Sequence, residues 1–153
     1  MSADETNRDR IAVKGTAAAP DAGGPHLLTN IIVADDILDW RVRIRSILQL
    51  HPQWLVCCEV CDGLQAVEKA TELHPDIVLL DIGMPVLNGI EAAKRIRQSS
   101  PTSRIIFVTQ DNDQDVRMAA LATGAEQYVI KANASSELLP AIDAALKNGH
   151  ALR

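Results

Sequence analysis

Short apolar runs alternate with amphipathic stretches along most of this chain, and the alternation predicts the fold class. Five runs have the length and composition of buried β-strands: Asn30–Ala34, Trp54–Val60, Asp76–Leu80, Arg104–Thr109 and Gln127–Ile130. After the first run, Trp40, Ile44, Ile47 and Leu48 recur at the spacing of one helix face. Strands that alternate with helices predict an α/β domain, in which helices cover both faces of a parallel sheet.

Four further helices are expected, over residues 64–73, 90–97, 113–122 and 137–147. An Asp-Gly turn precedes the first, Asn88-Gly89 precedes the second, and Gly124 is expected to cap the end of the third. Pro140 lies inside the last, where proline costs ~3 kcal/mol, so that helix is expected to start late or to bend. Because crossovers are right-handed, we predict a doubly wound (βα)5, flavodoxin-like sheet with strand order 2-1-3-4-5.

The first 26 residues differ in composition from the rest of the chain. They include the stretch GTAAAPDAGG, which is small, polar and rich in glycine and proline, and they show no apolar periodicity. Such a segment is typical of a flexible tail. We therefore predict a tail over 1–26, one folded domain over 27–149, and a C-terminal end or the start of a linker over 150–153.

Charge and composition exclude several classes of function. The chain has 153 residues, a net charge of −5 and only 3% aromatic residues. This composition argues against a basic nucleic-acid-binding face and against an aromatic platform for single strands. The sequence contains neither an apolar run of membrane-spanning length nor an N-terminal secretory signal. We expect a cytoplasmic protein without direct nucleic-acid or membrane contact.

Three cysteines, Cys57, Cys58 and Cys61, lie close together, and the last two form a C-x-x-C pair. That spacing occurs in redox and metal sites, but no second pair of cysteines or histidines stands nearby to complete a tetrahedral site. Two of the three lie within the apolar run WLVCCEV. We interpret them as small core residues of the second strand.

Acidic residues follow two strands that the predicted order places side by side. Asp35 and Asp36 follow the first strand, and Asp81 follows the third. Ligands bind at this edge of such sheets, where the strand order reverses. Three carboxylates in one cleft repel each other unless a cation joins them, and all-oxygen ligands suit Mg²⁺. The sequence therefore predicts a divalent metal site.

Two further strands end on groups suited to bind an anion. The fourth ends with the hydroxyl of Thr109, and the fifth is followed by the ammonium of Lys131. A metal, a hydroxyl and an ammonium around a carboxylate can stabilise a transferring phosphoryl group, and Asp81 could accept it. Each residue alone also has a simpler interpretation: Asp36 or Thr109 as a helix cap, and Lys131 as a surface lysine.

The segments that carry these residues resemble a known family. The pair DD after the first strand, LLDIGMPVLNGIE around the third, VT at the fourth and YVIK at the fifth are similar to the receiver domain of two-component response regulators. The likeness spans about residues 29–149. The phrases VCDGLQAVEKA and ALATGAEQYVIK are most similar to receivers of the NarL/LuxR class.

The resemblance implies a metal and a phosphoryl site. Asp81 would be the phosphoacceptor. Mg²⁺, or Mn²⁺ in its place, would be bound by Asp35, Asp36, Asp81 and the backbone carbonyl of Gly83. The chain would then be a phosphoacceptor that assists its own phosphorylation and dephosphorylation, and not an enzyme acting on other substrates.

The resemblance also implies a switch and partners. Thr109 and Lys131 would contact the phosphoryl oxygens, and Tyr128 would be an aromatic switch that turns inward when Thr109 moves. A sensor histidine kinase would donate the phosphoryl group from a phosphohistidine. A downstream protein or a fused output domain would read the face built by helix 113–122, strand 127–130 and helix 137–147, which could also form a phosphorylation-dependent homodimer.

One position departs from the family pattern in a way that suggests a kinetic role. Gln110 follows Thr109 where receivers usually have a small residue. Its longer side chain is expected to restrict access to Asp81. We hypothesise that it slows phosphoryl loss or transfer.

Other functions fit less of the sequence. A phosphatase or phosphotransferase of the haloacid-dehalogenase type would have an Asp-x-Asp motif on its first strand, and a flavodoxin-type binder would have a phosphate-cradling first loop instead of ADDILDW. A phosphorylation-independent interaction receiver would usually have lost Asp81, Thr109 or Lys131. A stand-alone receiver and a receiver fragment of a DNA-binding NarL/LuxR-type regulator both stay open.

Overall fold

The structure, a computed structural model, describes residues 28–151. The expected tail over 1–26 and the last two residues lie outside this range. The elements follow in the order β2 (Thr29–Ala34), α2 (Leu38–Leu48), β3 (Trp54–Val60), α3 (Gly63–Leu73), β4 (Ile77–Leu80), α4 (Gly89–Ser99), β5 (Arg104–Thr109), α5 (Gln114–Leu121), β6 (Gln127–Ile130), the short 3-10 helix η3 (Lys131–Asn133) and α6 (Ala134–Ala151).

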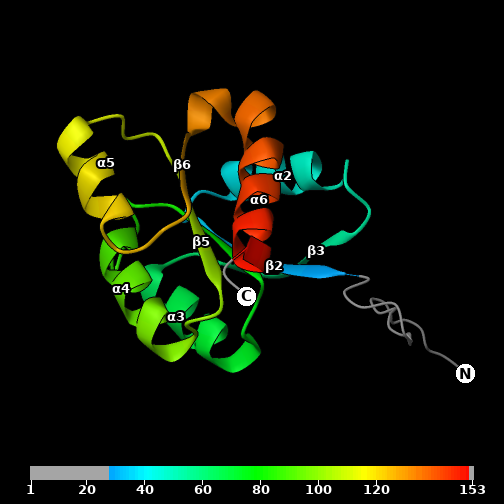
Figure 1. The fold of residues 1–153 in the computed structure, drawn as a ribbon. Coiled ribbons are helices and arrows are strands. Elements are labelled where there is room, and N and C mark those ends of the chain that lie inside the picture. Colours follow the sequence, from blue (N-terminus) through cyan, green and yellow to red (C-terminus); the bar gives the residue numbers. More distant parts are fainter. Residues whose placement is uncertain (1–27, 152–153) are drawn as a thin grey trace, which may run out of the picture.

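The five strands form one parallel sheet in the order β3-β2-β4-β5-β6. This order confirms the predicted 2-1-3-4-5 arrangement. In Figure 1, α2 and α6 lie on one side of the sheet and α3, α4 and α5 on the other. The two layers of buried side chains agree with this arrangement, because one contains residues of α3, α4 and α5 and the other contains residues of α2 and α6.

The central strands are apolar along the part where both of their faces are covered. All four residues of β4 are buried, and so are the last four of β2. Successive side chains of a strand point to opposite faces, so each strand supplies both layers. Ile32 and Ala34 pack toward α3 and α4, whereas Ile31 and Val33 pack toward α2 and α6.

Three helices begin at side-chain caps that the sequence provides. Asp62 accepts the Gln65 N–H at 2.8 Å, Asn88 accepts the Glu91 N–H at 3.0 Å, and Asp113 accepts two N–H groups of α5. Each cap satisfies backbone donors that have no partner within the helix. These caps fix the ends of the loops that lead from β3, β4 and β5 into the following helices.

Several predicted boundaries differ from the structure. Strand β4 begins at Ile77, so Asp76 precedes it, and the Asp76 carboxylate accepts the Asn30 N–H at 2.8 Å. Helix α5 ends at Leu121, and Gly124 lies beyond its cap with φ at +95°. Of the two outcomes expected at Pro140, a late start was wrong, because α6 begins at Ala134 and runs across the proline.

Candidate functional site

Asp35 and Asp81 continue the ladders of neighbouring strands, and this continuation brings them together. The Asp35 N–H donates to the Val60 carbonyl at 3.1 Å, and the Asp81 N–H donates to the Ala34 carbonyl at 3.0 Å. Asp36 follows directly. Carboxylate oxygens of Asp35, Asp36 and Asp81 all lie within 4.8 Å of one another. Among residues 28–151 this is the one group of three acidic, histidine or cysteine side chains close enough to share a metal ion.

The three carboxylates differ in burial and in hydrogen bonding. Asp35 and Asp81 are buried, whereas Asp36 is exposed. Asp35 Oδ1 accepts the Ile37 N–H at 2.9 Å, and Asp81 Oδ1 accepts the Ile82 N–H at 2.8 Å. Each of these local hydrogen bonds orients one oxygen of the side chain. The second oxygen of each buried carboxylate, Oδ2, lies near the ammonium of Lys131.

Lys131 lies between the two buried carboxylates. It is 1% exposed, and its Nζ lies 2.7 Å from Asp35 Oδ2 and 3.2 Å from Asp81 Oδ2. Burial raises the pKa of the Asp35 carboxyl, and the charge of Asp81 adds to this effect, while Lys131 and the Ile37 N–H oppose it. One ammonium therefore compensates only part of the negative charge in this site.

Asp35 Oδ2 has the geometry of an acceptor with spare capacity. It is buried and paired with Lys131 by charge, but no donor in the described part of the chain is aligned to form a hydrogen bond with it. A buried oxygen of this kind is normally satisfied by a hydrogen bond or an ion. Its neighbours are carboxylate oxygens, which are the ligands that Mg²⁺ prefers. The residues present therefore fit a hard divalent cation.

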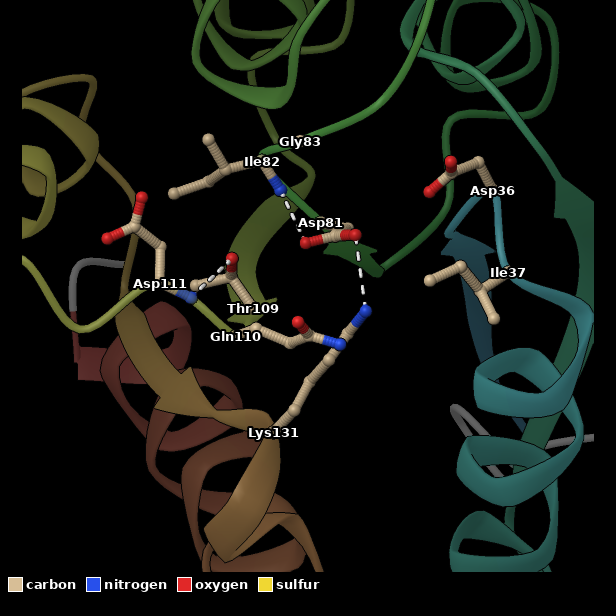
Figure 2. Close-up of a pocket in the computed structure, with 9 residues that line it drawn as sticks. All are labelled: Asp36, Ile37, Asp81, Ile82, Gly83, Thr109, Gln110, Asp111 and Lys131. Carbon is tan, nitrogen blue, oxygen red and sulfur yellow. Dashed lines mark hydrogen bonds and ion pairs between the residues drawn. The ribbon is translucent and has the colours of Figure 1, made fainter.

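A pocket of about 240 Å³ opens beside these groups, and Figure 2 shows the side chains that line it. Its lining comes from the ends of β2, β4, β5 and β6 and comprises Asp36, Ile37, Asp81, Ile82, Gly83, Thr109, Gln110, Asp111 and Lys131. Every residue predicted to bind the metal or the phosphoryl group lines this pocket, except Asp35. Asp35 instead pairs with Lys131, which does line the pocket. Gln110 lies there too, as its predicted role requires.

Tyr128 lies outside the pocket but is connected to Thr109 through one loop residue. The Thr109 hydroxyl accepts the Asp111 N–H at 3.2 Å, and the Tyr128 hydroxyl donates to the Asp111 carbonyl at 2.7 Å. Arg117 of α5 lies over the Tyr128 ring, 5.1 Å from its centroid. The ring is therefore held from two sides in this structure.

The simpler interpretations of Asp36, Thr109 and Lys131 were wrong. The N-cap of α2 is Ile37 without a side-chain bond, so Asp36 does not cap that helix. Asp113, and not Thr109, caps α5. Lys131 is buried and not a surface lysine. Neither Asp36 nor Thr109 caps a helix, and Lys131 is not a surface residue.

Gly89 begins α4 directly against the backbone of Asp81. A Cβ at this position would lie 1.9 Å from the Asp81 carbonyl oxygen, whereas a Cβ at Gly83 would meet nothing within 4 Å. We expect Gly89→Ala to lower the free energy of unfolding by about 2–3 kcal/mol, because backbone must move. Gly83→Ala is the matched control and should change it by less than about 0.5 kcal/mol. Urea denaturation of both variants measures the difference, and equal stabilities would contradict the close approach.

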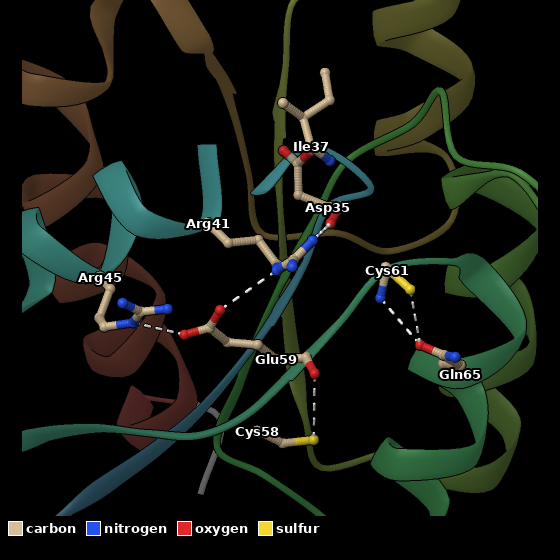
Figure 3. Close-up of polar contacts among 8 residues, drawn as sticks. All are labelled: Asp35, Ile37, Arg41, Arg45, Cys58, Glu59, Cys61 and Gln65. Carbon is tan, nitrogen blue, oxygen red and sulfur yellow. Dashed lines mark hydrogen bonds and ion pairs between the residues drawn. The ribbon is translucent and has the colours of Figure 1, made fainter. Parts of the chain in front are cut away.

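Arg41 has a role that the sequence analysis missed. Arg41 donates to the Asp35 carbonyl at 2.8 Å and lies 3.4 Å from Glu59. Arg45 binds the other oxygen of Glu59 at 2.7 Å, as Figure 3 shows. The pair of arginines thus ties α2 and the start of the acidic loop to β3. An acidic residue on the second strand is the only indication that the sequence offers.

The Glu59 network makes a pH-dependent contribution to stability. The hydrogen bond from Arg45 is the largest cause that lowers the pKa of Glu59, and Arg41 adds to it. A lowered folded pKa stabilises the protein above the unfolded pKa, and that contribution is lost as the pH falls through the folded pKa. We expect Glu59→Gln to cost about 1 kcal/mol near pH 7 and nothing in acid.

Thermal unfolding of Glu59→Gln and of the wild type, followed from pH 7 down into acid, measures this loss of stability. Glu68→Gln, on the exposed surface of α3, is the matched control and should follow the wild type at every pH. A deficit for Glu59→Gln that stays constant down to acid would contradict the ionic origin.

The cysteines are less buried than expected. Cys57 and Cys61 are exposed and Cys58 is half-buried, because β3 is an edge strand of the sheet. The interpretation as core residues was therefore wrong for two of the three. The Cys61 thiol lies 3.4 Å from Gln65 Oε1, and the Cys58 thiol lies 4.0 Å from the Glu59 carbonyl oxygen (Figure 3).

None of the helices between residues 28 and 151 combines the length and the apolar character that crossing a membrane requires.

Comparison with known proteins agrees with this geometry. The family model for the response regulator receiver domain matches residues 31–143. The transcriptional regulatory protein LnrK of Bacillus subtilis is 37% identical over 115 residues, which cover 75% of this chain and 52% of LnrK. The chain thus spans about half the length of that relative.

Two solved structures are similar over most of the chain. The response regulator domain of Thermotoga maritima CheB has a TM-score of 0.73 at 33% identity, covering 78% of this chain and 97% of that one. A LuxR-family two-component response regulator from Aurantimonas sp. SI85-9A1 has a TM-score of 0.75 at 32% identity, covering 79% and 86%. The resemblance to NarL/LuxR-class receivers is thereby confirmed. With its fold and its family match in agreement, this chain belongs to the response regulator receiver domains of two-component systems.

Proposed function

We propose that this receiver accepts a phosphoryl group on Asp81 from the phosphohistidine of a sensor histidine kinase, in a reaction that depends on Mg²⁺. The observation that carries the proposal is that Asp81, Thr109 and Lys131, from three different strand ends, meet at one pocket beside two more carboxylates. Receiver domains of two-component systems interact with histidine kinases and output domains.

The transfer is a displacement at phosphorus. An oxygen of the Asp81 carboxylate attacks the phosphorus, so an O–P bond forms while the N–P bond of the phosphohistidine breaks. The leaving imidazole nitrogen keeps the electron pair and takes up a proton from solvent. Thr109 and Lys131 contact the phosphoryl oxygens and stabilise their charge.

We assign the metal to Asp35, Asp36, Asp81 and the backbone carbonyl of Gly83, with Mn²⁺ able to replace Mg²⁺. When bound, the ion supplies positive charge that lowers the repulsion between the carboxylates and the incoming phosphoryl group. Asp36 is the exposed member of the three and is accessible to a hydrated ion. Asp35 supplies its oxygen without an aligned hydrogen-bond donor.

The switch we propose connects Thr109 to the surface through Asp111. Phosphorylation adds about −1.5 to −2 charges and draws Thr109 toward Asp81. Because Thr109 and Tyr128 are both bonded to Asp111, a shift of this loop releases the Tyr128 ring and changes the face of α5, β6 and α6. A downstream protein or a fused output domain reads this face, and a phosphorylation-dependent homodimer would form on it.

The proposal is tested by incubating the full chain with acetyl phosphate and Mg²⁺ and measuring its intact mass. One added phosphoryl group, absent when the metal is chelated, is the expected result. No adduct under any metal condition would overturn the proposal. It would favour a receiver that works through protein contacts without phosphorylation.

Gln110 sets the lifetime of the phosphorylated state in this account. It lies at the rim of the pocket and is exposed, so its side chain can obstruct the path of water to Asp81. We expect Gln110→Ala to accelerate phosphoryl loss by about threefold to tenfold, which is ~1 kcal/mol in the barrier. Gln110→Met keeps the length of the side chain and should keep the slow loss.

The rates follow from the decay of the phosphorylated mass after the donor is removed. If Gln110→Ala and the wild type lose the phosphoryl group at the same rate, Gln110 does not restrict access. If Gln110→Met is as fast as Gln110→Ala, the amide group and not the bulk of the side chain slows the reaction.

A further inference from the structure

Trp40 of α2 contacts Lys131, the lysine that lines the pocket. Its indole lies on α2, and Lys131 Nζ stands 5.0 Å from the ring centroid. The residue is half-buried, and on its outer side it lines a depression with Asp39, Val42 and Arg43. The ring therefore stands between the buried ammonium and the surface of α2.

The contact matters because Lys131 has an unusual environment. Its two carboxylate partners change during the proposed reaction, since Asp81 becomes an acyl phosphate and Asp35 would bind a metal. The aromatic face is the one partner whose charge distribution stays the same. An ammonium over an indole is stabilised by the ring quadrupole, and the effect grows when water is excluded.

We propose that Trp40 is a positioning residue for Lys131. The ring holds the ammonium at the level of Asp81 Oδ2 while its carboxylate partners change, and it keeps water from reaching Nζ through the α2 side. The proposal rests on the assignment of Asp81 as phosphoacceptor only where it concerns the reaction rate. The contact itself is a property of the folded chain.

Arg43 makes a second cation–π contact with the Trp40 ring. Its guanidinium lies 5.5 Å from the Trp40 centroid, and the residue is exposed. The aliphatic part of a long cationic side chain can cover apolar surface while its charged end stays in water. Arg43 makes no salt bridge among the described residues, unlike Arg41 and Arg45, which bind Glu59.

The first experiment measures the contact without any phosphorylation. In the full metal-free chain, the ring current of Trp40 should shift the Lys131 ε-methylene protons upfield in NMR spectra. Trp40→Leu should return these signals to ordinary lysine positions, and Trp40→Phe should keep part of the shift. Trp54→Phe is the matched control, since Trp54 stacks on His51 and does not contact Lys131. Unchanged Lys131 signals in Trp40→Leu would overturn the proposal.

The second experiment measures phosphorylation from acetyl phosphate with Mg²⁺. We expect Trp40→Leu to react about threefold to tenfold more slowly than wild type, a loss that matches a desolvated cation–π contact, and Trp40→Phe to recover most of the rate. Equal losses in Trp40→Leu and Trp40→Phe would show that the ring acts only by packing, and would contradict positioning. If the wild type itself takes up no phosphoryl group, the proposed function fails, and the NMR result still decides the contact.

Discussion

Replacing Asp81 with asparagine should abolish phosphoryl uptake from acetyl phosphate. An amide is a far weaker nucleophile than a carboxylate and cannot form the acyl phosphate. The change keeps the size of the side chain, so the fold should persist, because Asp81 Oδ1 and its amide equivalent can both accept the Ile82 N–H. Intact mass after incubation with Mg²⁺ and donor measures the uptake.

The matched control for this prediction is Asp111→Asn. Asp111 lines the same pocket and undergoes the same chemical change, but it does not touch Lys131 or the acidic group. The Asp111→Asn variant should take up one phosphoryl group, as the wild type does. Uptake by Asp81→Asn at the wild-type level would remove Asp81 from the reaction.

Removing the ammonium of Lys131 should have the second large effect. In Lys131→Met, the buried Asp35 and Asp81 lose their common partner, which leaves two uncompensated carboxylates. We expect the metal-free protein to lose about 2–3 kcal/mol of stability near pH 7, because breaking a buried ion pair is costly. Phosphorylation should slow by about 100-fold or more, as when a transition-state donor is deleted.

The sign of the pH dependence follows from Asp35. Burial already raises its pKa in the wild type, so the stability that Asp35 contributes is present below its unfolded pKa and is lost as the pH rises through its folded pKa. Lys131 lowers the pKa of Asp35, so its removal should raise this pKa further and make stability depend more strongly on pH. The stability deficit of Lys131→Met should therefore shrink as the pH is lowered, and Mg²⁺ should also reduce it.

Two variants separate this effect from general damage. Lys147→Met changes an exposed lysine of α6 and should match the wild type. Asp35→Asn, added to Lys131→Met, should restore much of the lost stability because it removes one buried charge. Denaturation curves of the three variants measure these differences. A Lys131→Met variant as stable as the wild type at pH 7 would contradict the charge balance described for the site.

The fold could be predicted largely from the apolar pattern. Three strands, Trp54–Val60, Arg104–Thr109 and Gln127–Ile130, have the bounds that the sequence predicts, because each is a short, mainly apolar run of strand length. The first residue of each helix was harder to predict from the sequence. The loss of one hydrogen bond at Pro140 is tolerated within α6, since the residue is exposed and the helix packs along its other face.

The candidate site could be predicted for a geometric reason. Parallel strands end at the same edge, so residues placed directly after them converge whatever the details of packing. The contacts of Trp40 and Arg41 depend on side-chain direction and on the neighbouring strand, which periodicity does not contain. The exposure of Cys57 follows from the edge position of β3, which the predicted strand order already implied.

The central claim is that Asp81 itself carries the phosphoryl group, and chemical mapping tests it most directly. Borohydride reduces an aspartyl phosphate to homoserine, so the phosphorylated chain can be reduced, digested and sequenced by mass spectrometry. We expect homoserine at position 81 and at no other aspartate. Homoserine at Asp36 or Asp111, or none in a chain that has gained a phosphoryl group, would contradict it.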